Sequence, residues 1–154
     1  IKNSLALYIV ELLQKCLKQP EQNTSLFHFC EDILIQLDSA EKEVTANFAL
    51  YFSLQLPQFF GFKMNDNYED ELTILDLVEG NFVARNPEHP HFIEGKYAEI
   101  TSQLLKAMHP DELNQFKFHH DTRRALLEHY LIYYALHITD FGQMKTLAIL
   151  QEVF

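Results

Sequence analysis

Apolar residues recur every three or four positions in two segments near the start of the chain. They are Leu5, Ile9, Leu12, Leu13, Cys16 and Leu17 in the first segment and Leu26, Phe27, Cys30, Ile33, Leu34 and Leu37 in the second. This spacing places the members of each set on one face of a helix. Pro20 separates the two predicted helices, and Thr24 or Ser25 is expected to cap the second.

Residues 43–60 predict a third helix that is apolar nearly all round. Its large side chains are Phe48, Leu50, Tyr51, Phe52, Leu54, Leu56 and Phe59. A helix without a polar face is usually enclosed by its neighbours, so we place this one at the centre of a helical bundle. Pro57 should kink or tighten its end.

Helical spacing resumes at 94–108, and Pro110 opens a short turn or helix. The strongest amphipathic segment follows, with Asp121 or Thr122 as its expected cap. Its apolar face consists of Leu126, Leu127, Tyr130, Leu131, Tyr134 and Ile138. A last short helix is expected after Gly142.

The pattern differs between residues 66 and 92. Two apolar runs, 74–78 and 81–83, flank Glu79-Gly80, which predicts a small β-hairpin. The carboxylates of 66–79 are not interrupted by Lys or Arg, which indicates a solvated insertion or, as the alternative, a cation or partner site. The predicted fold is all-α, a single helical bundle domain spanning residues 1–154 with a small β-hairpin insertion at about 66–92.

Charge limits the possible partners and points to one region of the chain. The formal net charge is −10, from 12 Lys and Arg against 22 Asp and Glu, so the chain by itself should bind DNA poorly. Residues 116–154 hold four basic and four acidic side chains, which makes the last third the most favourable for an anion. The candidate partner-contacting or DNA-contacting residues there are Lys117, His119, Arg123, Arg124 and Lys145, with His120 beside them.

The placement of two arginines strengthens a functional interpretation slightly, although an ordinary solvated face remains the favoured interpretation of this patch. Arg123 and Arg124 lie near the start of a predicted helix, where the helix dipole is already positive. Cations at that end do not stabilise the helix.

No pattern predicts catalysis or a cofactor. There is no Cys-x-x-Cys, no Gly-x-Ser-x-Gly and no glycine-rich phosphate loop, so we expect no catalytic residue, no metal and no cofactor. The alternative is a metal-dependent hydrolase that uses His89, His91 and nearby carboxylates. Cys16 and Cys30 lie on apolar stripes and should be unreactive. No apolar run is long enough to span a membrane, and no signal peptide is visible, so we expect a cytoplasmic protein.

Three segments, in this order, resemble the C-terminal region of the RecO family of bacterial recombination mediators. Residues 47–56 with Phe60-Gly61-Phe62 resemble its central helix, and residues 75–83 resemble the hairpin that follows. Residues 133–138, with Phe141-Gly142 and 145–147, are similar to the family's C-terminal ending. Together these segments cover most of the chain.

The resemblance implies a DNA-repair protein that is not an enzyme. Family members anneal single-stranded DNA and, with RecR, help to load the RecA recombinase onto DNA coated by single-strand-binding protein. Their N-terminal OB-fold binds single-stranded DNA. Because this chain starts at Ile1 within a helical pattern, we expect that domain to precede it. An unrelated helical protein-interaction domain is the remaining alternative.

The chain departs from the family pattern at two places. Many relatives carry zinc-binding cysteines around the hairpin, whereas residues 61–110 contain no cysteine, so we expect that site to be lost. Relatives also often carry arginine before the equivalent of Phe48, on a surface that receives the acidic C-terminal tail of single-strand-binding protein. Asn47 stands there in this chain. A tail contact would then be weaker, or would rely on residues such as Lys117 and Arg123.

Overall fold

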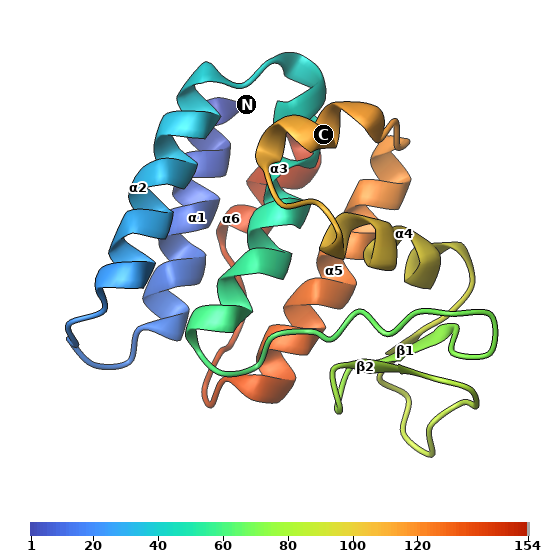
Figure 1. Ribbon diagram of the computed structural model, residues 1–154. Coiled ribbons are helices and arrows are strands. Elements are labelled where there is room, and N and C mark those ends of the chain that lie inside the picture. The colour runs from blue at the N-terminus through green and yellow to red at the C-terminus, as the bar shows by residue number, and fades with distance from the viewer. Residues whose placement is uncertain (154) are drawn as a thin grey trace.

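The structure, a computed structural model, describes residues 1–153 and is mostly helical (Figure 1). Its α-helices are α1 (Lys2–Cys16), α2 (Thr24–Ser39), α3 (Lys42–Gln55), α4 (Lys96–Leu105), α5 (His120–His137) and α6 (Thr146–Val153). Short 3-10 helices are η1 (Leu56–Phe59) and η2 (Pro110–Gln115). The strands are β1 (Ile74–Asp76), β2 (Asn81–Val83) and β3 (Phe92–Ile93).

Helix α3 lies at the centre, as its apolar sequence predicts. It packs against α1, α4, α5 and η2, and Figure 1 shows it between the α1–α2 pair and the helices α4 and α5. Phe48, Leu50 and Phe52 are completely buried, because neighbours cover every side of the helix. At Leu56 the α-helix tightens into η1, in which Pro57 lies, and this confirms the expected effect of that proline.

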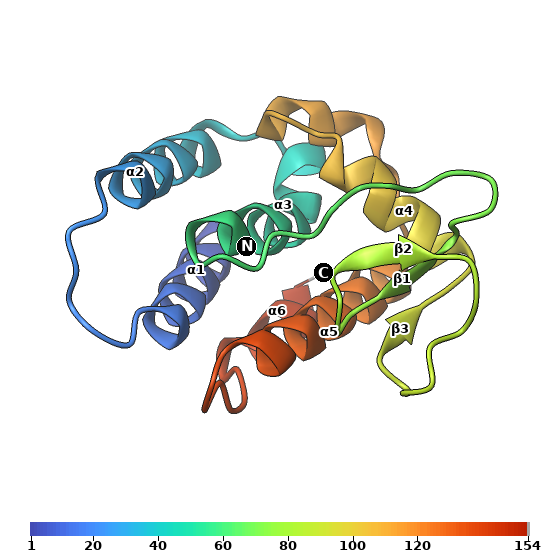
Figure 2. The ribbon, with the colours of Figure 1, turned by 60° about the horizontal axis from the view of Figure 1, so that its bottom comes forward.

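The predicted hairpin forms, and a third strand joins it. Strand β1 pairs antiparallel with β2, with Leu75 opposite Phe82, and antiparallel with β3, with Leu75 opposite Ile93. The insertion is therefore a three-stranded sheet with order β2-β1-β3 and not a hairpin alone. Figure 2 shows the sheet beside α5, on the opposite side of the molecule from α2. The fold is mostly helical as predicted, with this sheet as its non-helical part.

Hydrogen bonds hold the segment before β1 against the sheet and α4. The Asn67 side chain donates to the Phe82 carbonyl oxygen at 2.9 Å and accepts from the Phe82 amide at 2.8 Å. Ser102 on α4 donates to the Asp66 carboxylate at 2.7 Å. Residues 61–110 supply no thiolate, so this region does not fit the zinc site that the family resemblance implies.

Helix α2 departs from its predicted stripe. Leu26, Ile33 and Leu37 are buried, but Phe27 is 63% exposed and Leu34 is 43% exposed. The helix lies at the edge of the molecule with α1 and α3 as its main neighbours, so only part of its apolar surface is covered.

Two predicted helix caps are wrong by a few residues. Asn23, and not Thr24 or Ser25, caps α2, because its side-chain oxygen accepts from the Leu26 amide at 2.9 Å. His119, and not Asp121 or Thr122, occupies the cap position of α5. No helix within residues 1–153 has both the length and the apolar character that are needed to cross a membrane.

Candidate partner-binding site

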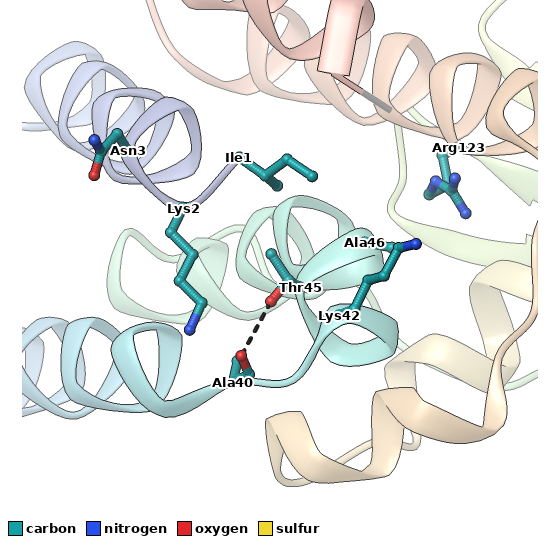
Figure 3. Close-up of a pocket in the computed structure, with 8 residues that line it drawn as sticks. All are labelled: Ile1, Lys2, Asn3, Ala40, Lys42, Thr45, Ala46 and Arg123. Carbon is teal, nitrogen blue, oxygen red and sulfur yellow. Dashed lines mark hydrogen bonds between the residues drawn. The ribbon is translucent and has the colours of Figure 1, made fainter.

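A pocket of about 630 Å³ opens where the first turns of α1, α3 and α5 converge (Figure 3). Its lining residues are Ile1, Lys2, Asn3, Ala40, Lys42, Thr45, Ala46 and Arg123. Figure 3 shows the side chains of Ile1, Lys42 and Arg123 pointing toward the same space from three parts of the chain. The pocket thus combines apolar walls with the cationic side chains of Lys42 and Arg123, whereas the Lys2 ammonium group points away and donates to the Asp38 carbonyl oxygen at 2.5 Å.

A second pocket of about 510 Å³ adjoins the first and shares Lys42, Ala46 and Arg123 with it. Its other lining residues are Glu43, Phe116, Lys117, Phe118 and His119. We call the two pockets together the cationic cleft, defined by the cations Lys42, Lys117 and Arg123, with Lys2 at its edge. Among the described residues that line it, Glu43 is the only carboxylate.

The electrostatics of the cationic cleft favour an anion. Lys2 and Lys42 are the first residues of α1 and α3, and Arg123 lies in the first turn of α5. Each helix adds the partial positive charge of its N-terminal end to the formal charges of these side chains. Helix α3 also begins without a side-chain cap, so amide groups of its first turn remain available to an acceptor. An anionic group bound there would relieve the repulsion between these positive charges.

Arg123 links the cleft to the structure around it. Its guanidinium donates to the Phe118 carbonyl oxygen at 2.6 Å, which holds the segment before α5 against the helix. Burial lowers the pKa of the Arg123 side chain, but a guanidinium stays protonated at neutral pH. Arg123 therefore contributes both positive charge and the position of Phe118.

The structure brings together only part of the predicted basic patch. Lys117, His119 and Arg123 line the cleft, whereas Arg124 is half-buried beside it and lines neither pocket. Lys145 lies beyond the far end of α5, which at 18 residues is about 27 Å long, so it cannot act with the others.

The sequence pattern does not identify Lys2 and Lys42 as residues of this site. Each lies far along the chain from Lys117 and looks like an ordinary exposed lysine. The signal that could have found them is the one that drew attention to Arg123, namely a cation at the N-terminal end of a helix.

Asn47 does not lie on an exposed surface, which corrects the expectation from the family resemblance. Only 1% of the residue is exposed, and its amide donates to the carbonyl oxygens of Phe116 at 2.8 Å and Leu113 at 3.3 Å. The side chain holds η2 and the segment that carries Lys117 against α3. Its influence on the cleft is therefore indirect.

His89 and His91 are not arranged as the hydrolase alternative requires. Nε2 of His89 lies 3.1 Å from a carboxylate oxygen of Asp76, and Nδ1 accepts from the His91 amide at 3.2 Å. Both ring nitrogens of His89 are thus engaged, one with Asp76 at the end of β1 and one with the backbone of His91. Among residues 1–153, no third carboxylate, histidine or cysteine completes a metal-binding group with this pair.

The two cysteines lie in apolar surroundings, as predicted. Burial raises the pKa of the Cys16 thiol to about 12 and also raises that of Cys30, which is half-buried. Both thiols are therefore protonated at neutral pH, which makes them poor nucleophiles.

Comparison with known proteins identifies relatives along the whole chain. Residues 1–68 match the family model described as "Recombination protein O C terminal". The chain is 32% identical over 154 residues to DNA repair protein RecO of Azobacteroides pseudotrichonymphae, covering 100% of this chain and 63% of that protein. Its identity to the RecO protein of Christiangramia forsetii is also 32% over 154 residues, with 100% and 62% covered. No solved structure matches the chain significantly.

The fold places this chain among mostly helical domains that carry a small antiparallel sheet at one side. The matches add the family: over its whole length the chain is similar to proteins of the RecO family. This similarity confirms the resemblance to the RecO family that the central helix, the hairpin and the C-terminal ending indicate. The chain spans about 63% of the length of the curated relatives it matches.

Proposed function

We propose that residues 1–154 form the partner-docking domain of a non-enzymatic recombination mediator in DNA repair. The names of the relatives, DNA repair protein RecO, support the DNA-repair role. In the whole protein this domain would act as a scaffold while the protein anneals single-stranded DNA and, with RecR, helps to load RecA. The absence of catalytic patterns from the sequence supports a non-enzymatic role.

The cationic cleft is the observation that carries the docking role. Lys42 and Arg123 converge on one partly apolar pocket, although the chain as a whole has a net charge of −10. We propose that this cleft receives the acidic C-terminal tail of single-strand-binding protein. Carboxylates of the tail would pair with the cations, and apolar side chains would pack on Ile1 and Ala46.

Binding of single-stranded DNA would fall mainly to a part of the protein outside these residues. The net negative charge of the domain opposes the close approach of a phosphate backbone. The relatives are longer than this chain, which leaves room for a separate DNA-binding domain.

Fluorescence anisotropy with a labelled tail peptide tests the proposal on residues 1–154. We expect binding in roughly the micromolar range, weakened about tenfold by Lys42→Glu, which corresponds to about 1.4 kcal/mol. Lys42 is exposed, so its replacement should leave the fold intact. Lys63→Glu is the matched control, because Lys63 is also exposed, lies outside the cleft and gives the same change in net charge.

Equal binding by the wild type and Lys42→Glu would exclude the cationic cleft as the tail site. The same chain should have no measurable affinity for single-stranded DNA at about 0.15 M salt. Tight, salt-sensitive binding of single-stranded DNA by residues 1–154 would contradict the division of roles.

A further inference from the structure

Three consecutive side chains at the start of α5 form a cluster of possible metal ligands at the edge of the cationic cleft, which His119 also lines. Ligand atoms of His119, His120 and Asp121 all lie within 4.8 Å of one another. Nδ1 of His119 is 3.3 Å from one carboxylate oxygen of Asp121, and Nε2 of His120 is 3.0 Å from the other. The two imidazole rings are tilted by 41° relative to each other, with centroids 4.1 Å apart.

These separations are close to those of ligands around one metal ion. Zinc binds histidine nitrogen and carboxylate oxygen at about 2.0–2.2 Å in tetrahedral geometry, which places neighbouring ligand atoms about 3.3 Å apart. The His119–Asp121 and His120–Asp121 contacts already meet this requirement. All three side chains are exposed, so a metal ion can reach them from solvent.

We propose that His119, His120 and Asp121 form a surface site for a divalent transition-metal cation of the zinc class. Two imidazoles and a carboxylate supply three ligands, and solvent leaves a fourth position open. His119 also lines the cationic cleft, so a metal held there could take a carboxylate or phosphate oxygen in its open position at the edge of the cleft. The site is separate from the sheet, where family members carry zinc.

The surrounding groups determine which cations can bind. The positive end of α5, together with Lys117 and Arg123, repels any cation at this position. Binding must therefore depend on the strong bonds that imidazole nitrogen forms with transition metals, and not on charge alone. Mg²⁺ and Ca²⁺, which prefer oxygen ligands, should not bind.

The cluster can bind a metal with little loss of existing interactions. His119 caps α5 through a contact of 3.5 Å between its Nδ1 atom and the Asp121 amide, which is at the weak limit of a hydrogen bond. His120 makes no cap contact, and its close partner is Asp121. Replacement of His120 thus removes a ligand without removing the cap.

Isothermal titration of residues 1–154 with Zn²⁺ tests the site. We expect one zinc ion per chain, and His120→Ala or Asp121→Asn should weaken the affinity by at least about tenfold. Titration with Mg²⁺ should give no binding heat. Circular dichroism of each variant verifies that α5 and the rest of the fold are retained.

His28→Ala is the matched control, because His28 forms an exposed pair with Glu31 at 3.7 Å but has no third ligand in the described residues. It should leave zinc affinity unchanged. Absence of zinc binding, or binding that His120→Ala and Asp121→Asn both leave intact, would overturn the proposal. Neither result would bear on tail binding, which is measured without zinc.

Discussion

Asn47 is a polar residue in the middle of an apolar helix, and its side chain determines where the neighbouring segment lies. Its amide group satisfies two carbonyl oxygens, those of Leu113 and Phe116, in the core between α3 and η2. Buried carbonyl groups that lose their donors have no access to water to replace them. The residue thus links the central helix to the segment that supplies Lys117 to the cleft.

Asn47→Ala should lower the free energy of unfolding by about 1–3 kcal/mol, because it removes the donor to the Phe116 carbonyl oxygen, while the Leu113 carbonyl oxygen still accepts from the Phe116 amide at 3.1 Å. Urea denaturation measures this change. Asn114→Ala is the control, because Asn114 is an exposed asparagine on η2, and its replacement should change stability by less than about 0.5 kcal/mol. Equal effects of the two replacements would show that the buried amide does not hold η2.

Gly80 is the second residue whose identity the structure requires. It adopts a φ of +72° between β1 and β2, and a Cβ atom there would lie 2.7 Å from the Tyr133 hydroxyl oxygen. That hydroxyl is itself fixed, because it donates to the Phe62 carbonyl oxygen. A side chain at position 80 would therefore meet both backbone strain and a steric clash.

Gly80→Ala should destabilise the protein by about 1–3 kcal/mol more than Gly61→Ala. Gly61 has a similar φ of +80°, but a Cβ atom there meets nothing within 4 Å. Both variants have the backbone strain, but only Gly80→Ala has the clash. The difference between the thermal unfolding midpoints of the two variants therefore measures the effect of the clash. Similar midpoints would mean that Tyr133 moves aside at little cost.

At the scale of elements, a single carboxylate fixes the start of α6 to α1. Glu11 accepts from the amides of Lys145 and Thr146 and from the Thr146 hydroxyl, at 2.7–2.8 Å. Burial tends to raise the pKa of the Glu11 carboxyl. The hydrogen bonds from Thr146 and Lys145, with Lys15 nearby, outweigh this effect and lower the pKa.

This lowered pKa predicts a pH dependence. The ionised carboxylate of Glu11 stabilises the fold fully above its ordinary pKa of 4.5, and the contribution is lost as the pH falls through the lowered value. Glu11→Gln should therefore cost about 0.5–2 kcal/mol near neutral pH and progressively less in acid. The unfolding midpoints of the wild type and Glu11→Gln should converge as the pH is lowered. A difference that stays constant with pH would show that the ionised carboxylate of Glu11 does not stabilise the fold.

The sequence predicts helices and strands well where apolar residues recur with a regular spacing over many positions. Helices α3 and α5 were found because their apolar positions extend over several turns, and the hairpin because Gly80 separates two apolar runs. Strand β3 was missed because Phe92–Ile93 is too short to show alternation. The cap at His119 was missed because histidine rarely serves in that position.

The candidate site could be predicted only in part, because its residues come together through tertiary packing. Lys117, His119 and Arg123 are close in the sequence and were found as a patch. Lys2 and Lys42 join them only because α1 and α3 begin at the same end of the molecule. Lys145 follows the C-terminal end of α5 and so lies away from the cleft at the start of that helix.

At the scale of the whole molecule, an acidic chain carries one concentrated positive region. The net charge of −10 should repel nucleic acid and most acidic proteins at long range, while the cleft attracts a carboxylate at short range. Tail binding should therefore weaken with salt, because the cations of the cleft are partly exposed. A peptide affinity that stays constant between about 0.05 and 0.5 M salt would exclude charge pairing as its basis.

The most direct test of the docking role is a nuclear magnetic resonance titration of ¹⁵N-labelled residues 1–154 with the acidic tail peptide. We expect the largest changes in amide chemical shift around the cationic cleft, at Lys42, Ala46, Phe118 and Arg123. Shifts concentrated instead along the groove between α5 and α6, around Leu131 and Leu147, or on the sheet would contradict it.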